Sequence, residues 1–318
     1  MIRLSSSVVR ANFLLRHTPA TQNVRHFSKD DSFQGTWKFL SESTPVHYMQ
    51  EALTAVHDIS GLPWWATIAV STFALRTVIT LPLTVYEYKI ISRIEKIRKE
   101  YPAIIEELKR ETAIAKNQFK WTDDQAKRMF MHSAAKQWNN LVVRENCHPA
   151  KTKITILFQL PFWITTSVAI RNLVYCLPNP NLLEAKMAFM DLCTGGFLWI
   201  PNLTVPDESW ILPVALGLVN FTNMKIQMTW RKTGPETKLQ TGIRRVFIGL
   251  NFVMVYIATI APSALCLYWV SSSMHGMVQN LAFVSPKVRR VLGIPELKHY
   301  PKDKPYKYLL ERMLSRNK

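Results

Sequence analysis

A single charged residue, Arg76, lies near the middle of a 28-residue stretch from Ile59 to Tyr86 that contains no other charge. About 20 apolar residues are enough to cross a bilayer. An Arg at the centre of such a helix costs about 2.5–3.5 kcal/mol on insertion scales. It is therefore expected to face water, a carboxylate or a ligand, and to mark a functional site. The alternative is a structural Arg that bonds to backbone carbonyls or snorkels to the surface.

Three further stretches, 154–170, 209–224 and 246–283, contain no Asp, Glu, Lys or Arg. The last is 38 residues long, too long for one span, and Pro262-Ser263 near its middle predicts a break. We therefore expect an all-α membrane protein with five transmembrane helices. The other two stretches have only 17 and 16 residues, which implies local bilayer thinning or snorkelling ends. The expected spans are about 62–85, 154–175, 209–229, 245–261 and 264–283.

The net charge of +18 is distributed unevenly along the chain. Segment 86–153 has 15 basic and 9 acidic residues, and segment 285–318 has 10 and 3. By contrast, segment 29–58 has 2 basic and 5 acidic residues, and segment 172–208 has 1 and 4. This alternation between loops is the positive-inside pattern. It favours a membrane protein over a nucleic-acid-binding one, with the N-terminus on the acidic side and the C-terminus on the basic side.

Residues 1–27 have the composition of a mitochondrial transit peptide. Arg and Ser are frequent there, and no acidic residue occurs before Asp30. The sequence predicts cleavage after Phe27, and the alternative is a disordered basic N-terminus. For a chain that such a transit peptide directs to mitochondria, the basic side of the membrane is the matrix side. We expect a multi-pass inner membrane protein with its N-terminus in the intermembrane space and its C-terminus in the matrix.

Two segments outside the spans have helical patterns. Segment 28–60, expected in the intermembrane space, contains an amphipathic helix at 45–59 that Thr44 can cap and Gly61 ends. Its apolar stripe predicts a position on the membrane surface. Segment 86–152 predicts a matrix-side helical hairpin between the first and second spans, whose second helix starts at the capping box Thr122–Gln125. The hairpin has a mostly solvated face and could also receive a substrate.

Polar side chains line one face of the first span. Thr72, Arg76 and Thr80 are four residues apart, so they share a face, and the opposite side is apolar. Other spans contain isolated amides and hydroxyls, which commonly join helices to one another. The alternative is that some of them line a polar groove with Arg76. The candidate groove residues are Arg76, Thr72, Thr80, Gln159, Asn220 and Ser272.

Catalytic and metal-binding motifs are missing from the sequence. The four cysteines form no CxxC pair, so no metal site is expected. Cys176 and Cys193 are either free thiols, which we favour, or a disulfide. GxxxxGK, GxGxxG, GxSxG and HExxH do not occur, so we expect neither an enzyme nor a cofactor.

Five motifs follow one another along the apolar part of the chain. They are Gly61-Leu62-Pro63-Trp64-Trp65 with Arg76 and Leu81-Pro82-Leu83; Gln159-Leu160-Pro161; Phe197-Leu198-Trp199-Ile200-Pro201-Asn202-Leu203; Pro206-Asp207 with Leu212-Pro213; and Pro262-Ser263-Ala264-Leu265-Cys266-Leu267-Tyr268-Trp269 with Gln279. In this order they resemble the YidC/Oxa/Alb family of membrane protein insertases, over roughly residues 40–285. The transit segment and Asn146-Cys147-His148-Pro149 resemble the mitochondrial branch that assembles cytochrome c oxidase.

The resemblance implies an insertase core at 61–285 and a basic matrix tail at 286–318. It also implies a function, which is to translocate the C-terminal hydrophilic part of oxidase subunit II across the inner membrane. The implied partners are subunit II, its assembly chaperones and the lipid bilayer. The chain departs from the family at Ala264, often Gly, and at Ser271–Ser273, often Asn. Its tail has no heptads, unlike that of the ribosome-binding relative, which argues against ribosome contact.

Several other functions remain open from the sequence. One is a general inner membrane insertase with several substrates, and another is a passive scaffold for assembly of complex IV. A solute carrier or channel with Arg76 as an anion site is disfavoured because we find no internal repeat. An intramembrane hydrolase is disfavoured by the missing motifs.

Overall fold

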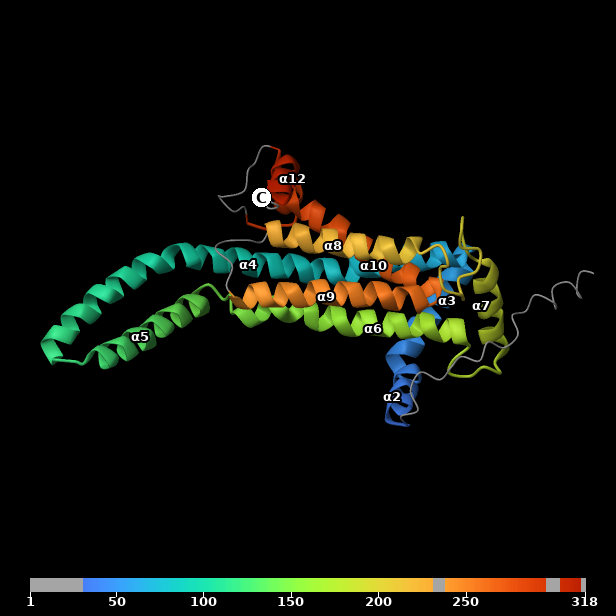
Figure 1. Ribbon diagram of the computed structural model, residues 1–318, viewed down its shortest axis with the longest axis horizontal. Coiled ribbons are helices and arrows are strands. Elements are labelled where there is room, and N and C mark those ends of the chain that lie inside the picture. The colour runs from blue at the N-terminus through green and yellow to red at the C-terminus, as the bar shows by residue number, and fades with distance from the viewer. Residues whose placement is uncertain (1–30, 231–237, 296–303, 316–318) are drawn as a thin grey trace, which may run out of the picture.

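The computed structural model describes residues 31–230, 238–295 and 304–315. Within these ranges the chain is helical, and the only pairing of extended backbone is a bridge between Phe197 and Ile200. The expected transit peptide lies outside the described residues, as does part of the basic tail. The helices form a bundle from which a long hairpin projects along the longest axis of the molecule (Figure 1).

The first expected span and the first helix of the hairpin are one continuous element. Helix α4, Trp64–Phe119, has 56 residues and contains Pro82 and Pro102 in its interior. Lys120, in the left-handed conformation at φ 52°, ends it. Helix α5, Asp123–Arg144, then returns beside it (Figure 1). The predicted capping box is confirmed, because Thr122 and Gln125 each bond the backbone N–H of the other.

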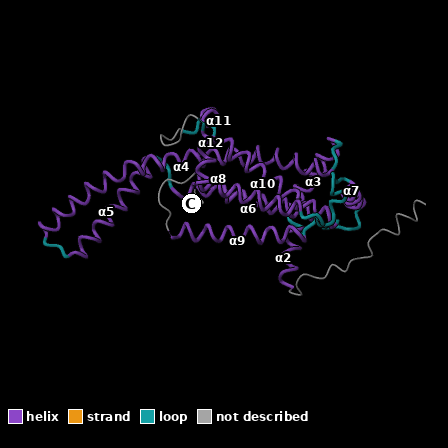
Figure 2. The backbone as a smooth tube through the Cα atoms, turned by 45° about the horizontal axis from the view of Figure 1, so that its top comes forward, coloured by secondary structure: helices purple, strands orange, loops and turns teal. Residues whose placement is uncertain are grey.

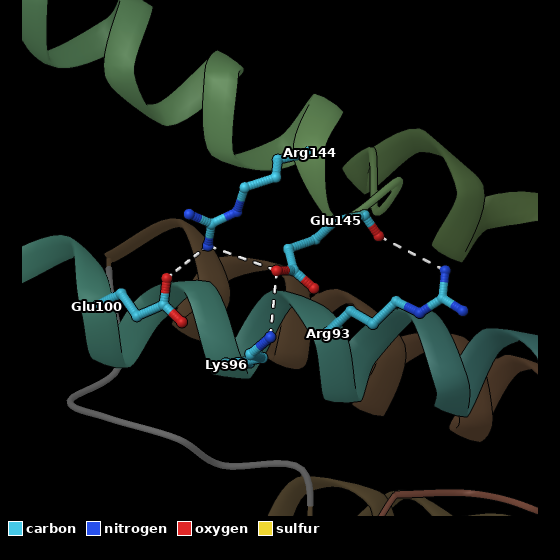
Figure 3. A network of polar contacts seen from close by, with 5 residues as sticks. All are labelled: Arg93, Lys96, Glu100, Arg144 and Glu145. Carbon is cyan, nitrogen blue, oxygen red and sulfur yellow. Dashed lines mark hydrogen bonds and ion pairs between the residues drawn. The ribbon is translucent and has the colours of Figure 1, made fainter.

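The hairpin has its own apolar core and a charged surface. Ile97 and Cys147 are fully buried there, and Trp138 packs edge-on against Tyr101. Where α5 ends, five charged residues join it to α4 (Figure 3). Arg144 binds Glu100 at 2.6 Å, and Lys96 binds Glu145 at 3.2 Å.

Four further helices complete the bundle. The short 3₁₀ helix Pro149–Lys153 leads into α6, Ile154–Tyr175, and α8 spans Ile211–Trp230. Helices α9, Lys238–Ile260, and α10, Ser263–Val284, are separated at Pro262, as the sequence predicts.

Helix α10 is the central helix of this bundle. It packs against α4, α6 and α8, and 14 of its 22 residues are buried. Helix α9, by contrast, packs mainly on α8 and lies apart from the other helices in Figure 2. From Thr241 to Ile260 only Ala258 is buried and more than half of the residues are exposed, many of them large and apolar. The two helices joined at Pro262 therefore occupy opposite environments.

In the part of the chain that the structure describes, three segments are long and apolar enough to cross a membrane. They lie within α4, in the α6 region from Pro149 to Tyr175, and within α9 from Thr241 to Ile260. Five had been expected from the sequence, but α8 and α10 do not reach the same mean hydropathy. Helices α6 and α8 have 22 and 20 residues, close to the spans expected at 154–175 and 209–229. Only their charge-free stretches, of 17 and 16 residues, are short.

Short helices cover the end of the bundle away from the hairpin. Helix α3, Thr44–Ser60, ends at Gly61 as predicted, whereas its N-cap is Ser43 and not Thr44. Its apolar stripe packs inward, because Val46 and Leu53 are buried in the main core against α6. Helix α7 (Leu183–Thr194) lies at the same end, and α2 (Asp31–Ser41) projects from the bundle, whereas α11 (Pro286–Val291) and α12 (Pro305–Ser315) lie near the end where the hairpin begins (Figures 1 and 2).

Candidate functional site

The polar face of α4 is turned into the bundle. Thr72, Arg76 and Thr80 are 4%, 6% and 3% exposed, whereas Val70 and Val78 on the other side are 52% and 75% exposed. A helix whose apolar side is outermost and whose polar side is enclosed suits a lipid surround. The periodicity of the sequence therefore identifies the inner face of this helix correctly.

The hydroxyl protons of both threonines are already used in hydrogen bonds to the backbone of α4. Thr72 donates to the carbonyl of Ile68 at 2.6 Å, and Thr80 donates to the carbonyl of Arg76 at 2.7 Å. Such bonds one turn back along the helix are common for Thr in apolar surroundings. Neither hydroxyl has a proton left for a ligand, so the threonines contribute only acceptor lone pairs to this face.

Arg76 is different, because part of its guanidinium has no partner. Its Nε is buried and makes no hydrogen bond. Across the described residues, no carboxylate forms an ion pair with it. An uncompensated buried charge is costly, so natural proteins rarely keep one without a reason. The arrangement can accept an anionic group that the described part of this chain does not itself supply.

Helix α10 presents three polar side chains toward this part of α4. Tyr268 and His275 lie within electrostatic range of the guanidinium. The hydroxyl of Ser272 lies beside that of Tyr268, together with that of Thr166 from α6. Of the candidate groove residues, Arg76 and Ser272 thus belong to one enclosed polar region shared by α4, α6 and α10.

Gln159 and Asn220 are placed differently. Gln159 on α6 is half-buried and has no hydrogen bond among the described residues. Asn220 on α8 accepts a bond from Ser273 of α10 at 2.7 Å. Other amides also join neighbouring helices, which is the helix-joining alternative considered above. These bonds run from Asn223 to the Ser273 carbonyl, from Asn280 to Asn223 and from Asn251 to the Gly217 carbonyl.

His275 was not identified from the sequence as part of the site. It is 6% exposed and contacts Thr77 of α4, with Nε2 and Oγ1 3.1 Å apart. Two signals could have revealed it. It is the only His in the charge-free stretch 246–283, and it follows Tyr268 and Ser271 at helical spacings of seven and four residues.

Groups for metal binding or disulfide formation are not assembled in the described part of the chain. No cluster of three His, Cys, Asp or Glu there could hold a metal ion. All four cysteines are free, including Cys176 and Cys193. Burial raises the pKa of the Cys176 thiol, which favours the protonated thiol over the reactive thiolate.

Two carboxyl groups outside the membrane bundle have pKa values that are shifted in opposite directions. At the base of the hairpin, the hydrogen bond from Lys96 lowers the pKa of the Glu145 carboxyl, and Arg144 adds to this effect (Figure 3). Glu95, the residue before Lys96 on α4, is buried, and its Oε2 has no hydrogen-bond partner. Burial raises the pKa of Glu95, although Lys99, Arg289 and Arg98 act in the opposite direction.

Comparisons with known proteins support the resemblance described above. Residues 55–289 match the family described as 60Kd inner membrane protein. The chain is 37% identical over 273 residues to the human protein named cytochrome c oxidase assembly protein COX18, mitochondrial, covering 86% of this chain and 80% of that protein. Identity to the mouse protein of the same name is 35% over 275 residues, covering 86% and 81%. A more distant relative is the mitochondrial inner membrane protein OXA1 of Arabidopsis thaliana, 28% identical over 254 residues, covering 80% and 52%.

The matched range includes α4, α6, α8, α9 and α10, and therefore Arg76 and every polar group around it. A match over most of the chain, together with relatives above 30% identity over most of their length, defines the family. The chain belongs to the 60Kd inner membrane protein family, the YidC/Oxa1 family of membrane insertases.

Proposed function

We propose that this chain is a mitochondrial inner membrane insertase for cytochrome c oxidase assembly. Its substrate is the C-terminal hydrophilic part of oxidase subunit II, which it moves from the matrix to the intermembrane space so that complex IV can be assembled. The observation that carries the proposal is Arg76, a buried cation without a carboxylate partner in the described part of its own chain. The names of the human and mouse relatives support the link to the oxidase.

Five helices cross the membrane in this proposal, namely α4, α6, α8, α9 and α10. Helix α10 needs little hydropathy of its own, because neighbouring helices surround it and lipid touches little of it. Helix α8 joins it through Asn220 and Asn223. The bias of basic residues places the α4–α5 hairpin and the C-terminus in the matrix, and the N-terminus in the intermembrane space.

The proposed mechanism uses charge and hydration. Arg76, Thr72, Thr80, Gln159, Asn220 and Ser272 line a groove that opens to the matrix and, on one side, to lipid. Acidic residues of the substrate are drawn to Arg76, because Coulomb attraction is stronger where the dielectric constant is low. The membrane potential adds about 2.3 kcal/mol per negative charge per 100 mV in the same direction. The apolar segment of the substrate then enters lipid past the exposed apolar side chains of α6 and α9.

This transport requires no covalent chemistry from the chain. We therefore propose that the protein is not an enzyme and uses no cofactor. Its partners are subunit II, the chaperones that receive it and the surrounding lipid, and it acts after synthesis without ribosome contact. No nucleic acid is a ligand.

The test replaces Arg76 in mitochondria that lack the native protein. Protease added outside the inner membrane measures the fraction of newly made subunit II whose tail has crossed. Arg76→Ala and Arg76→Glu should block export. Arg76→Lys should retain only part of it, because the charge is kept but the planar guanidinium with its paired N–H donors is lost. Arg110→Ala is a matched control, since Arg110 is an exposed Arg on the hairpin and its loss should leave export unchanged.

The same experiment separates the two alternative functions. A passive scaffold would lose oxidase assembly in the Arg76 variants while the tail still crossed. A general insertase would show defects in other mitochondrially made proteins as well as in subunit II. Normal export in both Arg76→Ala and Arg76→Glu would overturn the electrostatic step.

A further inference from the structure

His275 of α10 is held in one orientation by two side chains of α4. Its ring stands edge-on to Phe73, with centroids 5.4 Å apart and an interplanar angle of 81°. Its Nε2 is 3.1 Å from the Thr77 hydroxyl oxygen. With Nε2 held in this way, Nδ1, on the other side of Cε1, has a fixed direction.

The hydrogen bonds of Thr77 determine which ring nitrogen carries the proton. The Thr77 hydroxyl is 2.7 Å from the carbonyl oxygen of Phe73, which can only accept a bond. A hydroxyl has a single proton, so Thr77 donates to Phe73 and accepts from His275. In the neutral imidazole the proton is therefore on Nε2, and Nδ1 is a bare acceptor.

This acceptor is buried and has no partner. Nδ1 of His275 makes no hydrogen bond, and neither does Nε of Arg76, although both side chains are only 6% exposed. The two groups lie within electrostatic range of each other. A buried polar atom without a partner lowers stability. His275 contacts Phe73 and Thr77, which lie on either side of Arg76 along α4, so the two unpaired atoms belong to one contact between α4 and α10 and point to a ligand that satisfies both.

We propose that Arg76 and His275 form one site that binds a single carboxyl group of the translocated segment; this extends the proposed function and rests on it. One carboxyl oxygen accepts hydrogen bonds from Arg76. The other oxygen shares with Nδ1 one proton, which comes from water and returns to water when the carboxyl leaves. His275 thereby makes the site selective for a carboxyl over anions that cannot form both bonds.

Three substitutions separate recognition from packing. His275→Asn keeps an acceptor near the position of Nδ1, His275→Gln keeps a donor toward Thr77, and His275→Phe keeps a ring against Phe73. Each full-length variant is expressed in mitochondria lacking the native protein, and export of subunit II is followed over time by protease accessibility. Two substrates are compared, one with its native acidic tail and one whose acidic residues are replaced by Ser. Rates are normalised to the amount of each variant on an immunoblot.

His275→Gln and His275→Phe should slow export of the acidic tail by about tenfold, the effect of losing one hydrogen bond to a charged group. His275→Asn should stay within about threefold of the wild type on the same scale. The three variants should export the neutral tail equally. Wild-type rates for His275→Gln and His275→Phe would overturn the proposal, as would equal slowing of both tails, which indicates a structural role.

Failure of this inference is distinguishable from failure of the proposed function. If Arg76→Ala blocks export while His275→Phe and His275→Gln export normally, only the role of His275 is wrong. If Arg76→Ala exports normally, the electrostatic function fails as well.

Discussion

Charged side chains are arranged in opposite ways along the two halves of α4, where one half packs against α5 and the other lies in the bundle. In the hairpin, Arg144 of α5 reaches Glu100 at 2.6 Å and Glu145 at 3.4 Å, and its side chain is 54% exposed (Figure 3). In the bundle, Arg76 is 6% exposed and forms no ion pair with any residue that the structure describes. One helix thus carries a paired, wet charge network at one end and an unpaired, enclosed cation at the other.

The difference separates structural charge from functional charge. Exposed ion pairs contribute little to stability, so the hairpin network mainly sets the position of one helix on another. A buried cation without a partner costs free energy in the resting protein, and that cost is recovered only when an anion arrives. A missing partner, and not the presence of charge, is therefore what identifies the site.

The largest expected effect comes from giving Arg76 a resident partner. Thr72→Glu places a carboxylate one turn before Arg76, the favourable order for a helical ion pair. The bundle would then resemble the hairpin, and subunit II export should fall by about tenfold or more, since each 1.4 kcal/mol of lost attraction is a factor of ten. Protease accessibility of the tail measures the effect. Thr72→Gln is the size-matched neutral control, and equal export by both variants would contradict the comparison.

A smaller effect is expected at Glu95, a buried carboxyl on the hairpin side of α4. Because burial raises its pKa, the folded state holds the proton more tightly than the unfolded chain, and stability falls as pH rises through the window above 4.5. Glu95→Gln should remove this slope and raise stability at pH 7 by about 1 kcal/mol, or about 2–4 °C in melting temperature. Thermal unfolding of the purified protein between pH 4 and 7 measures it. Glu100→Gln is the matched control, and a lower melting temperature for Glu95→Gln would contradict the prediction.

The smallest effect is expected for the exposed network itself. Glu100→Gln and Arg144→Gln should leave export unchanged and lower hairpin stability only slightly, because solvent screens these charges. The loss should disappear at about 1 M salt, where the screening length is about 3 Å. Lys96 lowers the pKa of Glu145, so Glu145 contributes stability that is present above pH 4.5 and is lost as the pH falls through the lowered pKa. Hydrogen exchange at the base of α5 measures both effects. An export defect in either variant would contradict the claim that this network only positions one helix on another.

Much of the fold could be predicted because local signals and burial agree. The break at Pro262, the C-cap at Gly61 and the capping box of Thr122 with Gln125 all depend on residues close in sequence. The inner face of α4 follows from the spacing of Thr72, Arg76 and Thr80, because a helix has only one face for residues four apart.

Features that depend on tertiary contacts could not be predicted in this way. Helix α7 lies in a segment rich in Pro, Gly and Asn, and Ala188 and Leu192 pack into the core only because α6 is beside it. The continuity of α4 past Tyr86 was also missed, since a rise in charge marks the end of an apolar stretch and not the end of a helix. His275 became significant only when α10 placed it against Thr77.

Pro82 gives α4 a mechanical property that its length alone would not suggest. A helix of 56 residues is a rod about 84 Å long. Proline has no N–H, so the carbonyl of Val78 loses its usual partner just beyond Arg76 on the way to the hairpin. Of the two prolines inside α4, Pro82 is the one that stands between the guanidinium and the hairpin. The helix is therefore weakest, and most easily bent, at the point where its bundle half meets its hairpin half.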